Sequence, residues 1–135
     1  MKKKICIVVA NYYQSISKDL LNGTTKVLNN IGIKNFKKII VPGVFEIPFV
    51  ISKKINNYDA FIALGCIIKG ETPHFNLISK ASINAIMDLS VTHKKPIGNG
   101  IITCLNKKQA LIRSNPLEKD KGGEAAKAVL SVLKI

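Results

Sequence analysis

An apolar run from Ala60 to Ile68 constrains the fold more than any other feature of this sequence. The run is too short to cross a membrane, and it is typical of a strand that is buried on both faces. A polar turn follows, in which Thr72 can cap a helix and Pro73 would be the first helical residue. We expect that helix to run from about Phe75 to Val91. A strand buried on both faces predicts a parallel sheet covered by helices.

The turn after this strand is also a candidate binding site. Open α/β sheets bind ligands at the carboxyl ends of their strands, and the N–H groups and dipole of a helix N-terminus favour a phosphate there. Gly70 allows unusual backbone angles or the close approach of a ligand. His74, in the first helical turn, could transfer a proton near neutral pH. A well-capped connection without a ligand explains these residues equally well.

Strand and helix patterns alternate along the rest of the chain. The further strands are expected at Ile5–Ala10, Phe36–Val41 and Ile97–Thr103. The further helices are expected at Ser17–Asn30, Val44–Ile55 and Gly122–Leu133, together with a short helix that Asn106 caps and that ends near Arg113. This alternation predicts a single domain over residues 1–135, a three-layer α/β/α unit with a four-stranded parallel sheet of the flavodoxin-like kind. A chain of this length can bury a core without disulfides or a metal.

The formal net charge of +13 raises nucleic acid as a partner. The lysines, however, are scattered singly and in pairs, without interleaved aromatic residues. Of the 21 basic residues only Arg113 is an arginine, the usual reader of phosphates and bases. We therefore interpret the charge as a property of the surface and predict no nucleic-acid partner.

The cysteines and the N-terminus indicate the compartment. Cys6, Cys66 and Cys104 are odd in number and lack metal-ligand spacing, which favours free thiols in a reducing environment. Met1–Lys4 leads straight into a strand and lacks the apolar stretch of a signal peptide. The expected protein is cytoplasmic, with no metal and no membrane contact.

The turns after the other strands carry further candidates. Glu46 is a lone carboxylate in an apolar segment, so it either meets a polar partner or ligand, or faces solvent at a helix start. Tyr12 and Phe45 could stack on a flat ring, although Phe45 could equally pack in the core. Arg113 could bind a phosphate through two hydrogen bonds, or simply favour a helix C-terminus.

Two motifs give the sequence a resemblance to a known family. Residues 41–48 read V-P-G-V-F-E-I-P and residues 70–75 read G-E-T-P-H-F, and both closely resemble lumazine synthases of riboflavin biosynthesis. Gly98–Thr103 and Lys121–Ala126 fit the same family in the right order. The resemblance implies condensation of 5-amino-6-(D-ribitylamino)uracil with 3,4-dihydroxy-2-butanone 4-phosphate to 6,7-dimethyl-8-ribityllumazine, releasing phosphate and water. It implies no cofactor.

The resemblance also implies roles for individual residues. His74 matches the proton-transfer histidine, Glu71 and Thr72 match the turn that holds the phosphate, and Arg113 matches a phosphate-binding arginine from a neighbouring subunit. Lys121 matches a basic residue near that phosphate. The positions that would meet the pyrimidine and its ribityl chain are Tyr12, Val44, Phe45, Glu46, Cys66, Ile67, Ile68 and Asn99.

The sequence departs from the family pattern in three places. Asn11-Tyr12-Tyr13 stands where the family often has Arg-Phe-Asn, and Asn99 stands where many members place an aromatic residue over the ring. Pyrimidine binding is therefore expected to be altered rather than abolished. The loop Ser114–Lys121 lacks the glycines of many shell-forming members. We accordingly expect a homopentamer rather than an icosahedral shell, with riboflavin synthase as a candidate partner.

A flavin- or riboflavin-binding module of the same fold, without catalysis, is the alternative. Such a module predicts a glycine- or hydroxyl-rich phosphate loop after the first strand. Residues 11–17 contain hydroxyl groups but no glycine. The stronger phosphate signal follows the third strand, which favours the enzyme.

Overall fold

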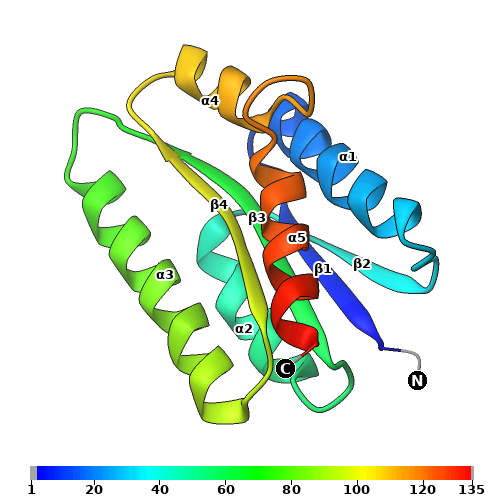
Figure 1. The fold of residues 1–135 in the computed structure, drawn as a ribbon. Coiled ribbons are helices and arrows are strands. Elements are labelled where there is room, and N and C mark those ends of the chain that lie inside the picture. The colour runs from blue at the N-terminus through cyan, green and yellow to red at the C-terminus, as the bar shows by residue number, and fades with distance from the viewer. Residues whose placement is uncertain (1–2, 135) are drawn as a thin grey trace.

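One parallel sheet organises the computed structural model, which describes residues 3–134 (Figure 1). Its strands lie in the order β2-β1-β3-β4. Their bounds are Ile5–Ala10 for β1, Phe36–Val41 for β2, Ala60–Ile68 for β3 and Ile97–Cys104 for β4. The expected α/β/α flavodoxin-like architecture is confirmed.

Strand β3 lies inside the sheet and is buried from Ala60 to Ile67. It pairs with β1, where Ala60 lies opposite Ile5, and with β4, where Phe61 lies opposite Ile97. Successive side chains point to opposite faces of a strand. Ile62 and Leu64 therefore enter one hydrophobic core, whereas Phe61 and Ala63 enter the other.

Helices cover both faces of the sheet (Figure 1). The first core contains residues of α1 (Gln14–Asn30), α4 (Lys107–Ser114) and α5 (Lys121–Leu133). The second core contains residues of a short 3-10 helix, η1 (Val44–Glu46), and of α2 (Ile47–Lys54) and α3 (His74–His93). Between residues 3 and 134, no helix is both long and apolar enough to cross a membrane.

The differences from the sequence prediction are local. The segment expected as one helix over 44–55 begins as η1 and continues as α2, with Pro48 in the first turn of α2. Pro73 is the N-cap of α3, so its expected place as the first helical residue is wrong by one position. The hydroxyl of Thr72 still accepts a hydrogen bond from the backbone N–H of His74, at 3.4 Å. β4 includes Cys104, which the sequence placed just after the strand.

Helices α1 and α5 pack at unusually close range. The buried hydroxyl of Thr24 donates to the carbonyl oxygen of Gly122 at 2.8 Å. A Cβ atom added at Gly122 would collide with the backbone carbonyl of Leu20. Glycine is therefore required at this position by the backbone of the neighbouring helix. Because α5 carries part of the candidate site, this contact also positions functional residues.

Gly122→Ala should lower the free energy of unfolding by about 1–3 kcal/mol, the usual cost of overpacking. The matched control is Gly70→Ala, because a Cβ atom there meets nothing within 4 Å and Gly70 has no positive φ. Urea unfolding at one protein concentration measures both variants. Equal urea midpoints for the two variants would contradict this prediction, because α1 and α5 would then accommodate the added methyl group at little cost in stability.

Candidate active site

The turns after β1 and β2 meet the end of β3 and the start of α3 at the carboxyl edge of the sheet and form a pocket. Its volume is about 270 Å³. The lining residues come from these turns, from the end of β3 and from the start of α3: Tyr12, Tyr13, Gly43, Val44, Phe45, Cys66, Ile67, Ile68, His74 and Ile78. We call this the His74 pocket. It brings together seven of the residues that the sequence nominated.

Two exposed aromatic rings belong to the His74 pocket. Tyr12 is 74% exposed and Phe45 is 73% exposed. The Tyr12 ring meets the Tyr13 ring edge-to-face, with centroids 5.0 Å apart. The alternative that Phe45 packs in the core is therefore wrong. Exposing such rings to water is unfavourable unless something covers them, so the pocket suits a flat, partly apolar ligand.

His74 is the first residue of α3, and its side chain is exposed at the pocket. The helix N-terminus there leaves backbone N–H groups without helical partners, which favours an anion. Glu71 and Thr72 lie in the exposed turn just before the helix, and neither lines the pocket. The turn is therefore beside the pocket rather than within its wall.

Glu46 lies at the end of η1 and is half-buried. Its side chain lies next to Gly43, where an added Cβ atom would come within 3.2 Å of the Glu46 Oε1 atom. Glu46 does not itself line the His74 pocket, although its neighbours Val44 and Phe45 do. The Glu46 carboxylate therefore lies just outside the pocket, on the side of Gly43, where a ligand that extends past Gly43 would reach it.

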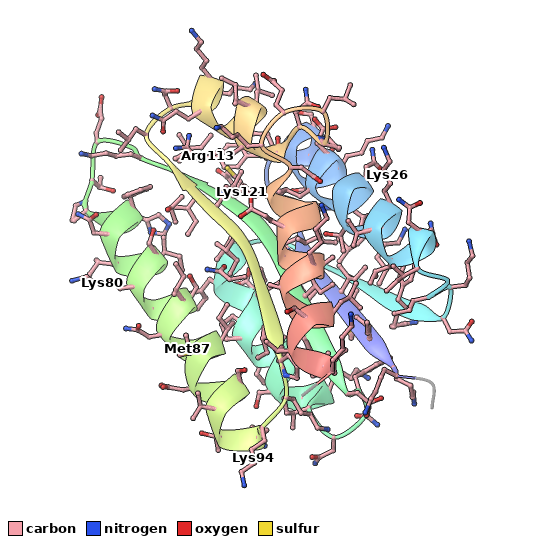
Figure 2. All side chains as sticks on the ribbon, in the orientation of Figure 1. Lys26, Lys80, Met87, Lys94, Arg113 and Lys121 are labelled. Carbon is pink, nitrogen blue, oxygen red and sulfur yellow. The ribbon has the colours of Figure 1, made fainter. Side chains whose placement is uncertain are left out.

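A second pocket lies between β4, α4 and α5, with a volume of about 390 Å³. Its lining residues are Asn99, Ile101, Ile102, Thr103, Arg113, Lys121, Glu124, Ala125 and Ala128. We call it the Arg113 pocket. Figure 2 shows Arg113 and Lys121 close to each other at the upper end of α5. Glu124 pairs with Lys121 at 3.3 Å, so Arg113 is the cation of this pocket that has no carboxylate partner among the described residues.

Local sequence explains how Arg113 is presented. Asn106 caps α4, because its side-chain oxygen accepts a hydrogen bond from the backbone N–H of Gln109 at 2.9 Å. Asp120 caps α5 in the same way through the N–H of Gly123, at 3.1 Å. The two caps fix the ends of the helices that carry Arg113 and Lys121.

Asn99 projects from β4, which is an edge strand. Its side-chain oxygen accepts a hydrogen bond from the backbone N–H of Ile101 at 3.1 Å. This bond leaves the side-chain NH₂ group as the free donor. If Asn99 meets a heterocycle, it therefore offers hydrogen-bond donors rather than a stacking ring.

The two pockets share no residue. Within one chain, Asn99, Arg113 and Lys121 therefore lie outside the His74 pocket. The family resemblance implies that Arg113 reaches the site from a neighbouring subunit. Among residues 3–134, no lysine or arginine lines the His74 pocket. A phosphate bound near His74 would thus meet the helix N-terminus of its own chain and no cationic side chain in the pocket wall.

Two buried thiols, Cys66 and Cys104, lie near the carboxyl ends of β3 and β4. Cys66 lines the His74 pocket, whereas Cys104 lines neither pocket as described. Burial disfavours the thiolate and raises the pKa of Cys66 to about 12. Burial also raises the pKa of Cys104, while the nearby charge of Arg113 acts in the opposite direction. All three cysteines are free thiols.

Sequence reasoning did not nominate every lining residue. Tyr13 and Ile78 line the His74 pocket, and Glu124 lines the Arg113 pocket. The signal for Tyr13 was its place directly after β1, beside Tyr12. Glu124 lies one helical turn after Lys121, a spacing at which opposite charges pair. Ile78 lies one turn after His74 and carried no distinguishing signal.

Comparison with known proteins decides the family. The family model described as 6,7-dimethyl-8-ribityllumazine synthase matches residues 2–135. The chain belongs to this family. It is 44% identical to the 6,7-dimethyl-8-ribityllumazine synthase of Bartonella bacilliformis, over 96% of this chain and 87% of the relative. It is 42% identical to 6,7-dimethyl-8-ribityllumazine synthase 1 of Rhodopseudomonas palustris, over 98% and 85%. It is 40% identical to the 6,7-dimethyl-8-ribityllumazine synthase of Agrobacterium fabrum, over 99% of this chain and 95% of the relative.

Iodoacetamide should modify Cys66 of the folded protein at pH 8 roughly a thousandfold more slowly than an unperturbed thiol, because so little thiolate is present. Raising the pH should accelerate the reaction about tenfold per unit up to the pKa near 12. Peptide mass spectrometry measures the rate, with denatured protein as the control. Rapid labelling of Cys66 in folded protein at pH 8 would contradict the buried, neutral thiol.

Proposed function

We propose that this protein is a lumazine synthase that condenses 5-amino-6-(D-ribitylamino)uracil with 3,4-dihydroxy-2-butanone 4-phosphate. The product is 6,7-dimethyl-8-ribityllumazine, with release of phosphate and water. The observation that carries the proposal is His74 at the mouth of a pocket with exposed aromatic rings, in a chain of the lumazine synthase family. The names of the relatives support the same activity.

The pyrimidine is proposed to bind in the His74 pocket. The exposed rings of Tyr12 and Phe45 offer apolar faces for a flat heterocycle, and Cys66, Ile67 and Ile68 form the wall at the end of β3. The ribityl chain would then extend along Val44 toward Glu46, whose carboxylate accepts hydrogen bonds from hydroxyl groups. The buried wall is apolar, so orientation depends on these few polar contacts.

The phosphate of the second substrate is proposed to bind at the N-terminus of α3, near Glu71, Thr72 and His74. A phosphate ester carries about two negative charges near neutral pH, and the described part of the chain contributes no lysine or arginine to the His74 pocket. Arg113, half-buried and held on a capped helix, provides the missing bidentate donor. Because Arg113 lies in the other pocket, we propose that it comes from a neighbouring subunit, with Lys121 behind it.

The chemistry then follows from positioning and proton transfer. An imine forms between the amine and the ketone with loss of one water, phosphate is eliminated, and ring closure on the remaining carbonyl releases a second water. Each step moves protons, and His74 is the side chain in the pocket that is suited to accept and donate them. Holding both substrates in one pocket supplies much of the remaining acceleration. The proposed reaction uses no metal or organic cofactor.

Assembly completes the proposal. Leu77 and Met87 lie on α3 and are 67% and 60% exposed (Figure 2 labels Met87 on this helix). A second copy packed on this face would bury them. We propose a homopentamer, a closed ring in which the Arg113 pocket of one subunit meets the His74 pocket of the next. The proposal places the protein in the cytoplasm, with riboflavin synthase as a candidate partner.

The direct test mixes purified protein with both substrates and follows lumazine absorbance and fluorescence against a reaction without enzyme. Product formation well above the spontaneous rate supports the proposal. No acceleration from folded, oligomeric protein would overturn it in favour of a non-catalytic flavin- or riboflavin-binding module. A titration with riboflavin, monitored by quenching of its fluorescence, would then test that module.

His74→Ala should lower kcat by about 10²–10⁴-fold, the usual range for loss of a proton-transfer group. The Michaelis constants of both substrates should change less, because the aromatic rings and the helix N-terminus remain. Steady-state kinetics with each substrate varied in turn measures these effects. An unchanged kcat would remove His74 from the mechanism.

Arg113→Ala should raise the Michaelis constant of the phosphorylated substrate far more than that of the uncharged pyrimidine, because only the former carries a phosphate. Equal effects on the two Michaelis constants would contradict this role.

Mixing Arg113→Ala subunits with His74→Ala subunits, followed by reassembly, tests whether each site takes His74 from one subunit and Arg113 from its neighbour. Random rings would contain intact interfaces at about a quarter of their sites, so activity should return toward that fraction of the wild type. Mixed rings with no recovered activity would show that both residues act within one subunit.

A further inference from the structure

We propose that the edge of the sheet opposite the candidate active site binds an acidic segment of a partner protein. This edge is formed by the amino ends of the strands and the C-termini of the helices (Figure 1). It gathers lysines that lie far apart in the sequence. We define the basic face as Lys3, Lys4, Lys34, Lys53, Lys54, Lys94, Lys95 and Lys134. The inference concerns a surface that the proposed reaction does not use.

The parallel sheet explains how these lysines come together. In a parallel α/β fold, the residues just before each strand and just after each helix meet at one edge. Lys3 and Lys4 precede β1, Lys34 precedes β2, and Lys94 and Lys95 precede β4. Figure 2 shows Lys94 at this edge, below the end of α3. The remaining members end or follow helices α2 and α5.

Few carboxylates balance this charge. Among the described residues, Asp59 is the acidic side chain at this edge, and its Oδ2 atom accepts a hydrogen bond from the backbone N–H of Lys4 at 2.7 Å. Five of the eight acidic residues lie toward the opposite edge: Glu46, Glu71, Glu118, Asp120 and Glu124. The two ends of the molecule therefore differ in charge, and the basic face is strongly positive.

The helix dipole accounts for only part of this face. Lysines near the C-termini of helices interact favourably with the dipole, and this explains Lys53, Lys54, Lys94 and Lys134. It does not explain Lys3, Lys4 or Lys34, which precede strands. Like charges placed together repel one another, so a bound anionic partner would relieve a cost that the isolated surface bears.

A depression within the basic face indicates which kind of peptide can bind there. Its volume is about 620 Å³, and its lining combines the lysines Lys3, Lys94 and Lys95 with the apolar side chains of Val91, Pro96, Val132 and Leu133. Asp59 and Ser90 also line it, and the Asp59 carboxylate accepts the hydrogen bond from the backbone N–H of Lys4. Lys95 is already engaged, because its Nζ atom donates to the carbonyl oxygen of Ile55 at 2.6 Å. Lys3 and Lys94 are exposed and remain available, and Val132 is 48% exposed. Lysines that lie beside apolar side chains are complementary to a peptide in which carboxylates flank an apolar residue.

These features favour an acidic peptide over a nucleic acid. Single-stranded nucleic acids bind on grooves that combine cations with aromatic platforms, and bases are commonly read by arginine. The basic face has no arginine, since Arg113 lies in α4. Its aromatic residue, Tyr58, is half-buried beneath the ammonium group of Lys4, at 5.5 Å from the ring centroid. Apolar contacts at the centre of a charged rim are typical of protein interfaces.

The test measures fluorescence anisotropy with the assembled protein and four labelled probes at low salt. The main probe is a twelve-residue peptide of glutamate and aspartate with two leucines, and the second replaces both leucines with serine. The third is a single-stranded oligothymidylate, and the fourth is an anionic phospholipid vesicle. The variant Lys3→Gln/Lys94→Gln removes two charges from the depression. Its matched control, Lys18→Gln/Lys26→Gln, removes two exposed charges from α1.

The Lys3→Gln/Lys94→Gln variant should bind the leucine-containing peptide about tenfold more weakly than the wild type, and the control should stay within about twofold. Replacing the leucines with serine should weaken binding to the wild type severalfold. Lumazine formation should be the same in both variants, which separates this surface from the active site. Equal losses in the two variants would overturn the proposal, because net charge alone would then explain binding. Tighter binding of the oligonucleotide or the vesicle than of the peptide would overturn it as well.

Discussion

The burial of β3 on both faces is the constraint on which the rest of the structure depends. Its side chains alternate between two hydrophobic cores, so helices must cover each face of the sheet. Its pairing with both β1 and β4 holds the sheet together across the middle. Its carboxyl end supplies Cys66, Ile67 and Ile68 to the His74 pocket. One apolar run therefore determines the layers of the fold and the place of the candidate site.

The parallel arrangement also divides the molecule into two chemically different ends. At the carboxyl edge, cations and carboxylates are mixed, and aromatic rings and His74 surround a pocket. At the amino edge, lysines from separate segments meet with a single described carboxylate between them, Asp59. The same topology thus creates a site suited to a small phosphorylated substrate at one end and a surface suited to an acidic partner at the other.

Much of the fold could be predicted from the sequence because its signals are local. The expected bounds of β1 and β2 agree with the structure, and Asn106 caps α4 as expected. The open alternatives and the errors concern residues whose local sequence is compatible with two structures. Phe45 could enter the core or line a pocket, and only the surrounding elements exclude the core. Pro73 suits either the cap or the first turn of a helix, and the difference is one residue.

By itself, the sequence determined the order of strands and helices, the motifs that carry the family resemblance, and the presence of a histidine beside a helix N-terminus. These depend on side-chain periodicity and on residue types at short spacing. Only the tertiary structure decided that Phe45 lies exposed at a pocket rather than in the core, and that scattered lysines form one face. Those facts depend on which segments the sheet brings together, and contacts between segments far apart in the chain leave little trace in local sequence.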